Sequence, residues 1–221
     1  MGLGLRKKYL MSLKRPSGRL PSSYQEVEYI SFSGVCYIDT GFKPSNNTKV
    51  VMDCINQSTH WLFGARDYSP QTSGFGTCTH YFSYGSTGTS FSTFVSPIRQ
   101  IITQDKNKIL VNGAQVSSTT AQTFTAIYNL FLFCLMQDGS VYSGTELTNQ
   151  DKCFSCQIYE NDVLQRDFVP CYRISDGEIG LYDVQNNVFY TNQGAGTFTK
   201  GNDVIYGYPE IGRAHVWTPV T

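Results

Sequence analysis

Helix-forming residues are scarce in this sequence. Its 221 residues include only 6 Ala and 13 Leu, whereas Tyr and Phe together number 29. Ala and Leu are among the best helix formers, and aromatic and β-branched residues suit pleated sheets, so helical bundles and doubly wound α/β folds are excluded. The aromatic side chains can also build a hydrophobic core, which excludes a wholly disordered chain.

Charge is scarce as well, and it is unevenly distributed. The chain has 17 basic and 17 acidic residues, but residues 1–23 hold six of the basic residues and no acid, which leaves the remainder with a net charge of −6. A mildly acidic surface repels phosphate, so no nucleic-acid partner is expected. Residues 1–19 are basic and contain Pro16 and Gly18, so they are predicted to form a flexible leader.

Long hydrophobic runs are absent. The most apolar stretch, residues 126–136, contains Asn129 and is far shorter than the roughly 20 residues of a membrane-spanning helix. Near the N-terminus, Tyr9–Leu13 is too short for the apolar part of a secretion signal, because Lys14 and Arg15 follow at once. The sequence therefore predicts neither membrane insertion nor a signal peptide, and any export would use another route.

The seven cysteines show no disulfide-scaffold spacing. Cys153 and Cys156 have the C-x-x-C spacing, but neither a second cysteine pair nor a histidine pair completes a zinc site. The two residues lie in a run of extended character, where side chains three residues apart point to opposite faces of a strand. We therefore predict a structural role for these thiols.

The C-terminal residues differ in character from the aromatic, glycine-rich sequence before them. Residues 211–220 match the translation of a common sequencing-library adapter, provided that a TGA codon is translated as Trp217, and Thr221 fits if one further base completes its codon. We interpret residues 206–221 as a tail in which residues 211–221 are a cloning or assembly artefact, and we exclude the artefact from the fold argument. The codons of this segment test the interpretation.

Short runs of aromatic and β-branched residues alternate with turn residues along most of the chain. The Asn112-Gly113 step is a strong hairpin signal because both residues tolerate positive φ, and the apolar run Leu130–Met136 is typical of a central strand. The other predicted strands cover residues 24–30, 35–40, 49–55, 60–65, 74–84, 91–95, 99–103, 108–111, 153–160, 163–169, 179–183 and 188–191.

Because no helical spacers separate these runs, the pattern predicts an all-β fold, a two-sheet antiparallel sandwich that residues 20–205 form as one domain. Alternation within the runs predicts which side chains point into the sandwich. The predicted core includes Ile38, Val50, Met52, Leu110, Leu130, Leu132, Ile158, Phe168 and Leu181.

Several segments carry a resemblance to a known domain family. Leu20–Ile30, Gln157–Arg173 and Asp176–Asp183 are similar to laminin-G-like, concanavalin A-like jelly-roll domains of phage tail and host-recognition proteins. Shorter matching segments are Tyr37–Pro44, Lys108–Gly113 and Gly196–Thr199. The resemblance implies a jelly-roll sandwich over nearly all of residues 20–200. Domains of this family bind sugars, bind proteins or space a fibre, so the resemblance leaves the activity open.

Catalytic motifs are missing from the sequence. Glycoside hydrolases use two carboxylates that face one cleft, and Glu26 and Glu28 have the i, i+2 spacing of one strand face. No third acid accompanies them, so we interpret them as a solvated face. Asp176 is expected to cap a turn, and neither His60 nor His80 has a nucleophile signature beside it. We predict no enzyme and no catalytic residue, with a glycoside hydrolase as the less favoured alternative.

Bound calcium is an alternative that the sequence leaves open. Jelly-roll domains often hold calcium with carboxylate and carbonyl oxygens, and Asp105, Asn107 and Asp138 offer such oxygens. No dense acidic loop surrounds these residues, and ordinary Asx turns explain all three. We therefore predict no metal and no cofactor. Arg166 and Asp167 are expected to make structural ion-pair or turn contacts.

Residues 60–92 combine aromatic, arginine and hydroxyl-bearing side chains, which is the chemistry of carbohydrate binding. We expect this stretch to form loops at one edge of the sandwich, and core packing is the alternative for each aromatic ring. The candidate ligand-binding residues are Trp61, Arg66, Tyr68, Tyr81 and Tyr84.

The leading hypothesis is a non-enzymatic domain of a phage virion, in a tail or host-recognition protein, that binds a cell-surface glycan. The alternative is a purely structural or protein-interaction module of a tail or baseplate, for example as a homo-oligomer. The expected partners are a surface glycan or other virion proteins, at the virion or an extracellular surface. An aromatic, polar face would favour glycan binding, an exposed apolar patch would favour the assembly module, and a cleft lined by two or more carboxylates would favour an enzyme.

Overall fold

The structure, a computed structural model, describes residues 19–57, 60–68, 72–92, 96–142 and 151–206. These residues form strands and turns and no helix, so none of them builds a helix long and apolar enough to cross a membrane. The predicted leader up to residue 18, the end of the predicted strand at 91–95 and the suspected artefact at 211–221 lie outside the described residues.

The larger sheet contains eleven strands. Its main path runs β11-β10-β9-β4-β15-β16-β17-β18, β1 pairs with β16, and β2 joins β15 to β19. The strands are β1 (Tyr24–Glu26), β2 (Ile30–Ser33), β4 (Thr48–Ile55), β9 (Gln100–Asp105), β10 (Lys108–Val111), β11 (Ala114–Ser118), β15 (Lys152–Glu160), β16 (Val163–Arg173), β17 (Ile179–Asp183), β18 (Val188–Thr191) and β19 (Thr197–Lys200).

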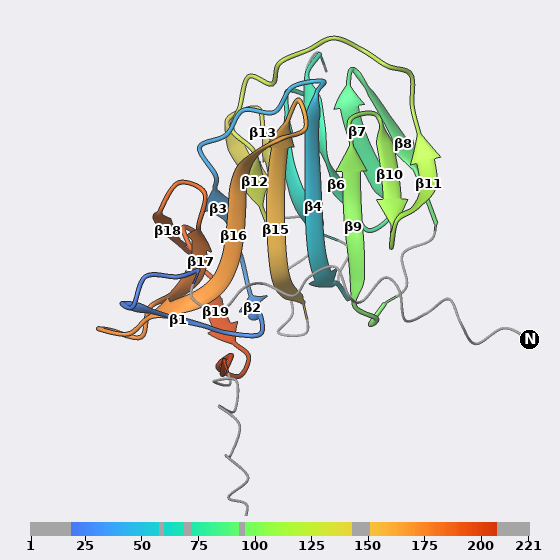
Figure 1. Cartoon of the computed structure of the whole chain (residues 1–221). Coiled ribbons are helices and arrows are strands. Elements are labelled where there is room, and N and C mark those ends of the chain that lie inside the picture. The colour runs from blue at the N-terminus through green and yellow to red at the C-terminus, as the bar shows by residue number, and fades with distance from the viewer. Residues whose placement is uncertain (1–18, 58–59, 69–71, 93–95, 143–150, 207–221) are drawn as a thin grey trace, which may run out of the picture.

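The smaller sheet contains eight strands in the order β14-β13-β5-β6-β7-β8, and β12 pairs with both β3 and β5. Its strands are β3 (Ile38–Asp39), β5 (Trp61–Arg66), β6 (Gly74–Cys78), β7 (Tyr81–Gly85), β8 (Thr87–Ser90), β12 (Phe131–Leu132), β13 (Leu135–Gln137) and β14 (Ser140–Tyr142). Every pairing in the two sheets is antiparallel except the one between β5 and β13. Figure 1 shows the sheets as two layers, with β4, β9, β15 and β16 in front of β6, β7 and β8. The all-β, two-sheet jelly-roll sandwich is confirmed.

The core lies between the two sheets and is rich in phenylalanine. Val50, Met52 and Cys54 of β4 point into it together, as the alternation in the sequence predicts. From the smaller sheet, Phe75 and Phe82 face them, and burial of such a ring stabilises the fold by roughly 1.5–3 kcal/mol. The predicted core residues that are buried are Ile38, Val50, Met52, Leu130, Leu132, Ile158, Phe168 and Leu181.

Leu110 is the one predicted core residue that the structure contradicts. It is only half-buried, whereas its neighbours Ile109 and Val111 point into the core. Both faces of β10 carry an apolar residue, so the sequence pattern does not identify the inner face, and pairing with β9 selects Ile109. The hairpin predicted at Asn112-Gly113 is confirmed, with φ values of +52° and +82° between β10 and β11.

The run Leu130–Met136 is two short strands and not the single central strand that we expected. Phe133 has a φ of +67°, in the left-handed region, and separates β12 from β13. β12 is antiparallel to β5 whereas β13 is parallel to it, so the chain reverses direction at this point. A continuous apolar run cannot reveal such a reversal, because both halves are buried.

Cys153 and Cys156 point to the same side of the sheet, contrary to the prediction of opposite faces. A β-bulge between Cys153 and Ser155 in the pairing with β4 inserts one residue and returns Cys156 to the core face. All seven cysteines are buried free thiols. Burial raises the pKa of the Cys36 thiol to about 11 and those of Cys54 and Cys156 well above the ordinary value. Such thiols are poor nucleophiles.

Arg19, which we predicted as the last residue of the leader, contacts the sandwich. Its guanidinium donates to the carboxylate of Asp167, a buried residue of β16. Arg166, next to Asp167, lies 3.5 Å from the carboxylate of Asp183 and donates to the carbonyl oxygen of Thr40. The structural ion-pair contacts expected for Arg166 and Asp167 are thus confirmed.

Candidate functional site

Most of the described residues between 60 and 92 lie in strands β5 to β8, which agrees with the strands predicted at 60–65 and 74–84 but not with the edge loops that we expected to carry the site. These four strands pair in sequence order and make up the centre and one side of the smaller sheet. Their inner face carries the large rings Phe75 and Phe82. Small residues lie side by side on their outer face, where Gly76 pairs with Gly64 on one side and with Ser83 on the other. Of the candidate residues, Tyr68 alone lies beyond a strand, just after β5.

Four of the five candidate residues meet on this outer face. The Arg66 guanidinium carbon lies 5.2 Å from the ring centroid of Trp61 and 4.8 Å from that of Tyr68. The ring of Tyr81 meets Trp61 edge-on, with 6.1 Å between the centroids. We call Trp61, Arg66, Tyr68 and Tyr81 the aromatic–arginine cluster. Each cation–π contact of this kind contributes roughly 0.5–2 kcal/mol to stability.

Two local features of the sequence bring Trp61 and Arg66 together. Residues five apart in a regular strand point to opposite faces, but a β-bulge between Trp61 and Phe63 turns Trp61 to the outer face. Gly64 then leaves room for the indole ring. A Cβ atom there would lie 3.3 Å from the Trp61 ring and 2.6 Å from Leu135 Cδ1, so any larger residue would displace one of them.

The four side chains of the cluster differ in exposure. Trp61 is 7% exposed and forms a small apolar cluster with Cys78 and Leu135, separate from the main core. Tyr81 is half-buried against this group, whereas Tyr68 is 57% exposed. Trp61 therefore forms the buried base of the cluster, in contact with Arg66 and Tyr81, whereas the ring of Tyr68 is exposed to solvent.

Arg66 is a nearly buried cation, at 9% exposure. Its Nη2 atom donates to the side-chain oxygen of Gln137, but its Nε atom is buried and has no hydrogen-bond acceptor among the described residues. Two nearby acidic residues, Asp67 and Asp138, form no ion pair with Arg66. The oxygens of Asp67 accept hydrogen bonds from Thr72 and Ser73, and Asp138 Oδ1 accepts one from the Tyr68 backbone at 2.7 Å.

Asp67 is held as an anion by these local donors. Its burial raises the pKa, but the hydrogen bonds from Thr72 and Ser73 have the larger combined effect and lower it below the usual value. The carboxylate therefore accepts its hydrogen bonds from Thr72 and Ser73, and it forms no ion pair with Arg66.

Tyr84 does not belong to the cluster, and its predicted place in a loop is wrong. It lies in β7 with its ring on the inner face, 2% exposed and edge-on to Phe124. Its hydroxyl donates to the carbonyl oxygen of Asn46 at 3.0 Å, beside a separate pocket lined by amide side chains. Tyr81 and Tyr84 are three residues apart in one strand, so opposite faces were to be expected.

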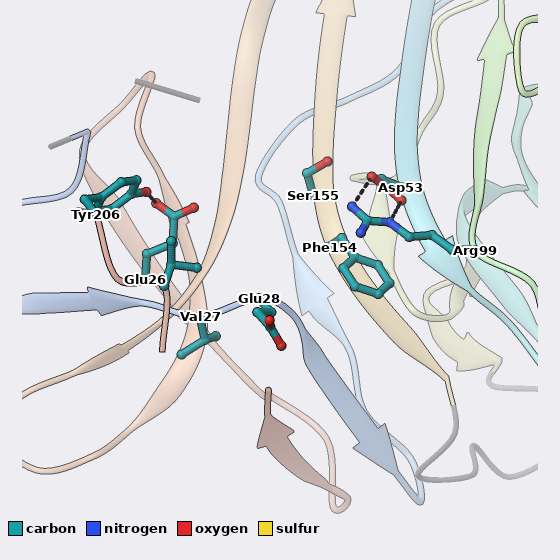
Figure 2. Close-up of a pocket in the computed structure, with 9 residues that line it drawn as sticks. Glu26, Val27, Glu28, Asp53, Arg99, Phe154, Ser155 and Tyr206 are labelled. Atoms are coloured by element: carbon teal, nitrogen blue, oxygen red, sulfur yellow. Dashed lines mark hydrogen bonds and ion pairs between the residues drawn. The ribbon is translucent and has the colours of Figure 1, made fainter. Parts of the chain in front are cut away.

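A second candidate site lies at the larger sheet. Figure 2 shows a pocket of about 210 Å³ whose lining includes three carboxylates, those of Glu26, Glu28 and Asp53. Glu26 and Glu28 flank the buried Val27, so the i, i+2 spacing does place both at one pocket. The sequence analysis did not connect Asp53 with them, because a long-range strand pairing brings it there.

Each of these three carboxylates has a donor. Arg99 binds Asp53 through two hydrogen bonds, of 2.8 and 2.7 Å, and its guanidinium lies 3.7 Å from the ring centroid of Phe154. Hydrogen bonds to Asp53 raise the pKa of Arg99 above its ordinary value. The Tyr206 hydroxyl donates to Glu26, and the Asn202 amide lies 3.3 Å from Glu28. Asp53 is thus held in an ion pair, whereas Glu26 and Glu28 accept hydrogen bonds from neutral donors.

His60, at the start of β5, is fully buried and carries no catalytic partner among the described residues. Neither ring nitrogen has a hydrogen-bond partner there, and Nδ1 lies 3.9 Å from Asp151 Oδ2. Burial lowers the pKa of His60 to about 4. Within the part of the chain that the structure describes, no group of three or more His, Cys, Asp or Glu side chains is placed to hold a metal ion.

Comparisons with known proteins give one distant likeness. No protein-family model and no curated protein matches the sequence. Among solved structures, the chain resembles a putative carbohydrate binding protein from Bacteroides ovatus, with 10% sequence identity and a TM-score of 0.43. The match covers 81% of this chain and 62% of that one, so this chain spans less than two thirds of its length. A likeness this distant says nothing about what the present chain binds.

Proposed function

We propose that the aromatic–arginine cluster binds carbohydrate and that the chain is a non-enzymatic glycan-binding domain. The observation that carries the proposal is the exposed Tyr68 ring stacked on Arg66, next to the half-buried Tyr81. Sugars present apolar CH faces that pack on aromatic rings and hydroxyls that accept hydrogen bonds from guanidinium groups. Both kinds of surface are present within one cluster.

The cluster is built to hold its shape before a ligand arrives. Arg66 is the last residue of β5, its guanidinium lies over the rings of Trp61 and Tyr68, and the backbone of Tyr68 is hydrogen-bonded to Asp138. A group that is already ordered loses less conformational entropy when it binds. A single aromatic–sugar contact contributes on the order of 1 kcal/mol, so one site alone would bind weakly.

We extend the proposal to the setting in which weak sites are useful. In a phage tail or host-recognition protein, many copies of the domain would face one cell surface, and simultaneous attachment raises the effective affinity by orders of magnitude. The resemblance of Gln157–Arg173 and Asp176–Asp183 to domains of such proteins supports this setting. The proposed location is the virion or an extracellular surface, with a surface glycan or other virion proteins as partners.

A multivalent fusion of the full chain, applied to a glycan array, tests the proposal. We expect binding to a subset of glycans, and we expect Tyr68→Ala to weaken it about fivefold without lowering the melting temperature, because the ring is exposed. Tyr142→Ala is the matched control. Tyr142 is 51% exposed on β14 of the same sheet but makes no ring contact with the cluster.

Two results would contradict the proposal. If the fusion binds no glycan, the structural or protein-interaction module takes its place. If Tyr68→Ala and Tyr142→Ala have equal effects, glycan binding occurs elsewhere on the domain.

A further inference from the structure

From the surroundings of Arg66 we infer that the site recognises an acidic sugar, and that Arg66 binds its carboxylate. This inference rests on the proposed carbohydrate binding and names the class of ligand. Arg66 is nine-tenths buried, yet it forms no ion pair with a carboxylate of the described residues. A buried charge without a counter-charge is costly, so the missing partner points to a ligand.

The geometry of the cluster leaves the edge of the guanidinium as the place for that partner. The rings of Trp61 and Tyr68 lie against the guanidinium, whereas its N–H groups point outward within its plane. One of these donors, on Nη2, is taken by Gln137, and the buried Nε has no acceptor among the described residues. A carboxylate that replaces Gln137 at this edge would accept two parallel hydrogen bonds, from Nε and Nη2, which a single hydroxyl oxygen cannot do.

Arg99 shows what a completed arrangement looks like in the same molecule. It also stacks on an aromatic ring, that of Phe154, and Asp53 accepts two hydrogen bonds from its edge. At Arg66 the two nearby acids are committed elsewhere, Asp67 to Thr72 and Ser73 and Asp138 to the Tyr68 backbone. Among the described residues, both arginines thus have aromatic contacts, but only Arg99 has a carboxylate partner.

The ligand class follows from these contacts. The exposed ring of Tyr68 packs against the apolar face of a sugar, while Arg66 binds a carboxylate on that sugar. Uronic acids and sialic acids both have this chemistry. Two pairs of probes separate them: oligogalacturonate with its methyl ester, and sialyllactose with lactose. In each pair the carboxylate is the principal difference in charge.

The test measures binding of the multivalent full-chain fusion to both pairs. We expect at least one acidic probe to bind ten times more tightly than its neutral partner, and the preference to shrink as salt is added. Arg66→Gln should abolish the preference while keeping the weak neutral binding that Tyr68 provides. Arg99→Gln is the charge-matched control and should retain the preference.

The outcomes separate the two claims. Equal binding of acidic and neutral probes by the unmodified chain overturns the carboxylate inference and leaves carbohydrate binding intact, whereas no binding to any glycan overturns both. Tighter binding of sulfated lactose than of either acidic probe also overturns the inference, because a sulfate would then be the preferred anion. These comparisons need no variant, so they hold even if Arg66→Gln fails to fold.

Discussion

The two sheets treat their charges differently. On the larger sheet, several cations have carboxylate partners from the chain itself: Arg99 pairs with Asp53, Arg166 with Asp183 and Lys49 with Asp162. On the smaller sheet, Arg66 pairs with no described carboxylate, and the buried His60 has only Asp151 at 3.9 Å. An ion pair that the chain completes serves the fold. A buried cation without a carboxylate partner among the described residues lowers the stability of the fold, and destabilising groups of this kind are often found at functional sites.

The largest effect that we expect concerns His60. Its folded-state pKa, about 4, is below the unfolded value of 6.5, so the unfolded chain takes up a proton first as the pH falls. Titration of His60 therefore lowers stability between pH 6.5 and about 4 and contributes no further loss below, about 3 kcal/mol in total. Urea unfolding at pH 7, 5.5 and 4.5 measures this loss.

Two variants decide whether His60 causes it. His60→Leu removes the titrating ring and should flatten the loss over this pH range, whereas His80→Leu, at an exposed position, should leave it unchanged. An unaltered pH dependence in His60→Leu would show that the buried polar groups of the smaller sheet are not the weak points of the fold.

The next largest effect separates Arg66 from Arg99. Arg99→Met leaves Asp53, a nearly buried carboxylate, without its cation, and should lower the free energy of unfolding by about 2 kcal/mol. Arg66→Met removes a cation that has no counter-charge among the described residues and puts an unbranched apolar side chain beside Trp61, so the change should stay within about 1 kcal/mol. Thermal and urea unfolding at pH 7 compare the two. Equal losses would mean that both arginines serve the fold alike.

Much of the fold could be predicted because it depends on local patterns. The alternation in β4 and the Asn112-Gly113 hairpin are both local, and both are confirmed. The errors had two different causes. Both faces of β10 carry an apolar residue, so the local pattern did not identify its inner face even within the β9–β10 hairpin. The face of Cys156 depends on a bulge against β4, which is distant in the sequence, so no short stretch of sequence reveals it.

The candidate site could be predicted in composition but not in geometry. The sequence shows that aromatic and arginine residues are concentrated near Trp61. It does not show the β-bulge between Trp61 and Phe63, without which Trp61 and Arg66 would point to opposite faces of the sheet. Tyr84 could have been separated from Tyr81 by strand alternation alone. The pairing of Arg99 with Asp53, residues 46 apart in the chain, gave no signal in the sequence.

The smallest expected effect tests whether Tyr81 takes part in the site on the smaller sheet. Gly88 lies beside Ser83 on the neighbouring strand, and a Cβ atom there would lie 1.6 Å from the Tyr81 hydroxyl oxygen and 2.1 Å from the ring carbon that carries it. Gly88→Ala must therefore displace the Tyr81 ring from its place beside Trp61. If Tyr81 contacts the ligand, glycan binding should weaken about threefold, which is less than the loss of a complete aromatic contact.

A double-mutant cycle gives this prediction its control. In a Tyr81→Ala background the added methyl group of Gly88→Ala meets no ring, so the second change should have no further effect on binding. The four proteins are compared by affinity for the best glycan of the array and by melting temperature. Independent, additive losses would mean that Gly88 acts through the strand and not through Tyr81. The binding face would then consist of Tyr68 and Arg66, with Tyr81 serving only to pack against Trp61.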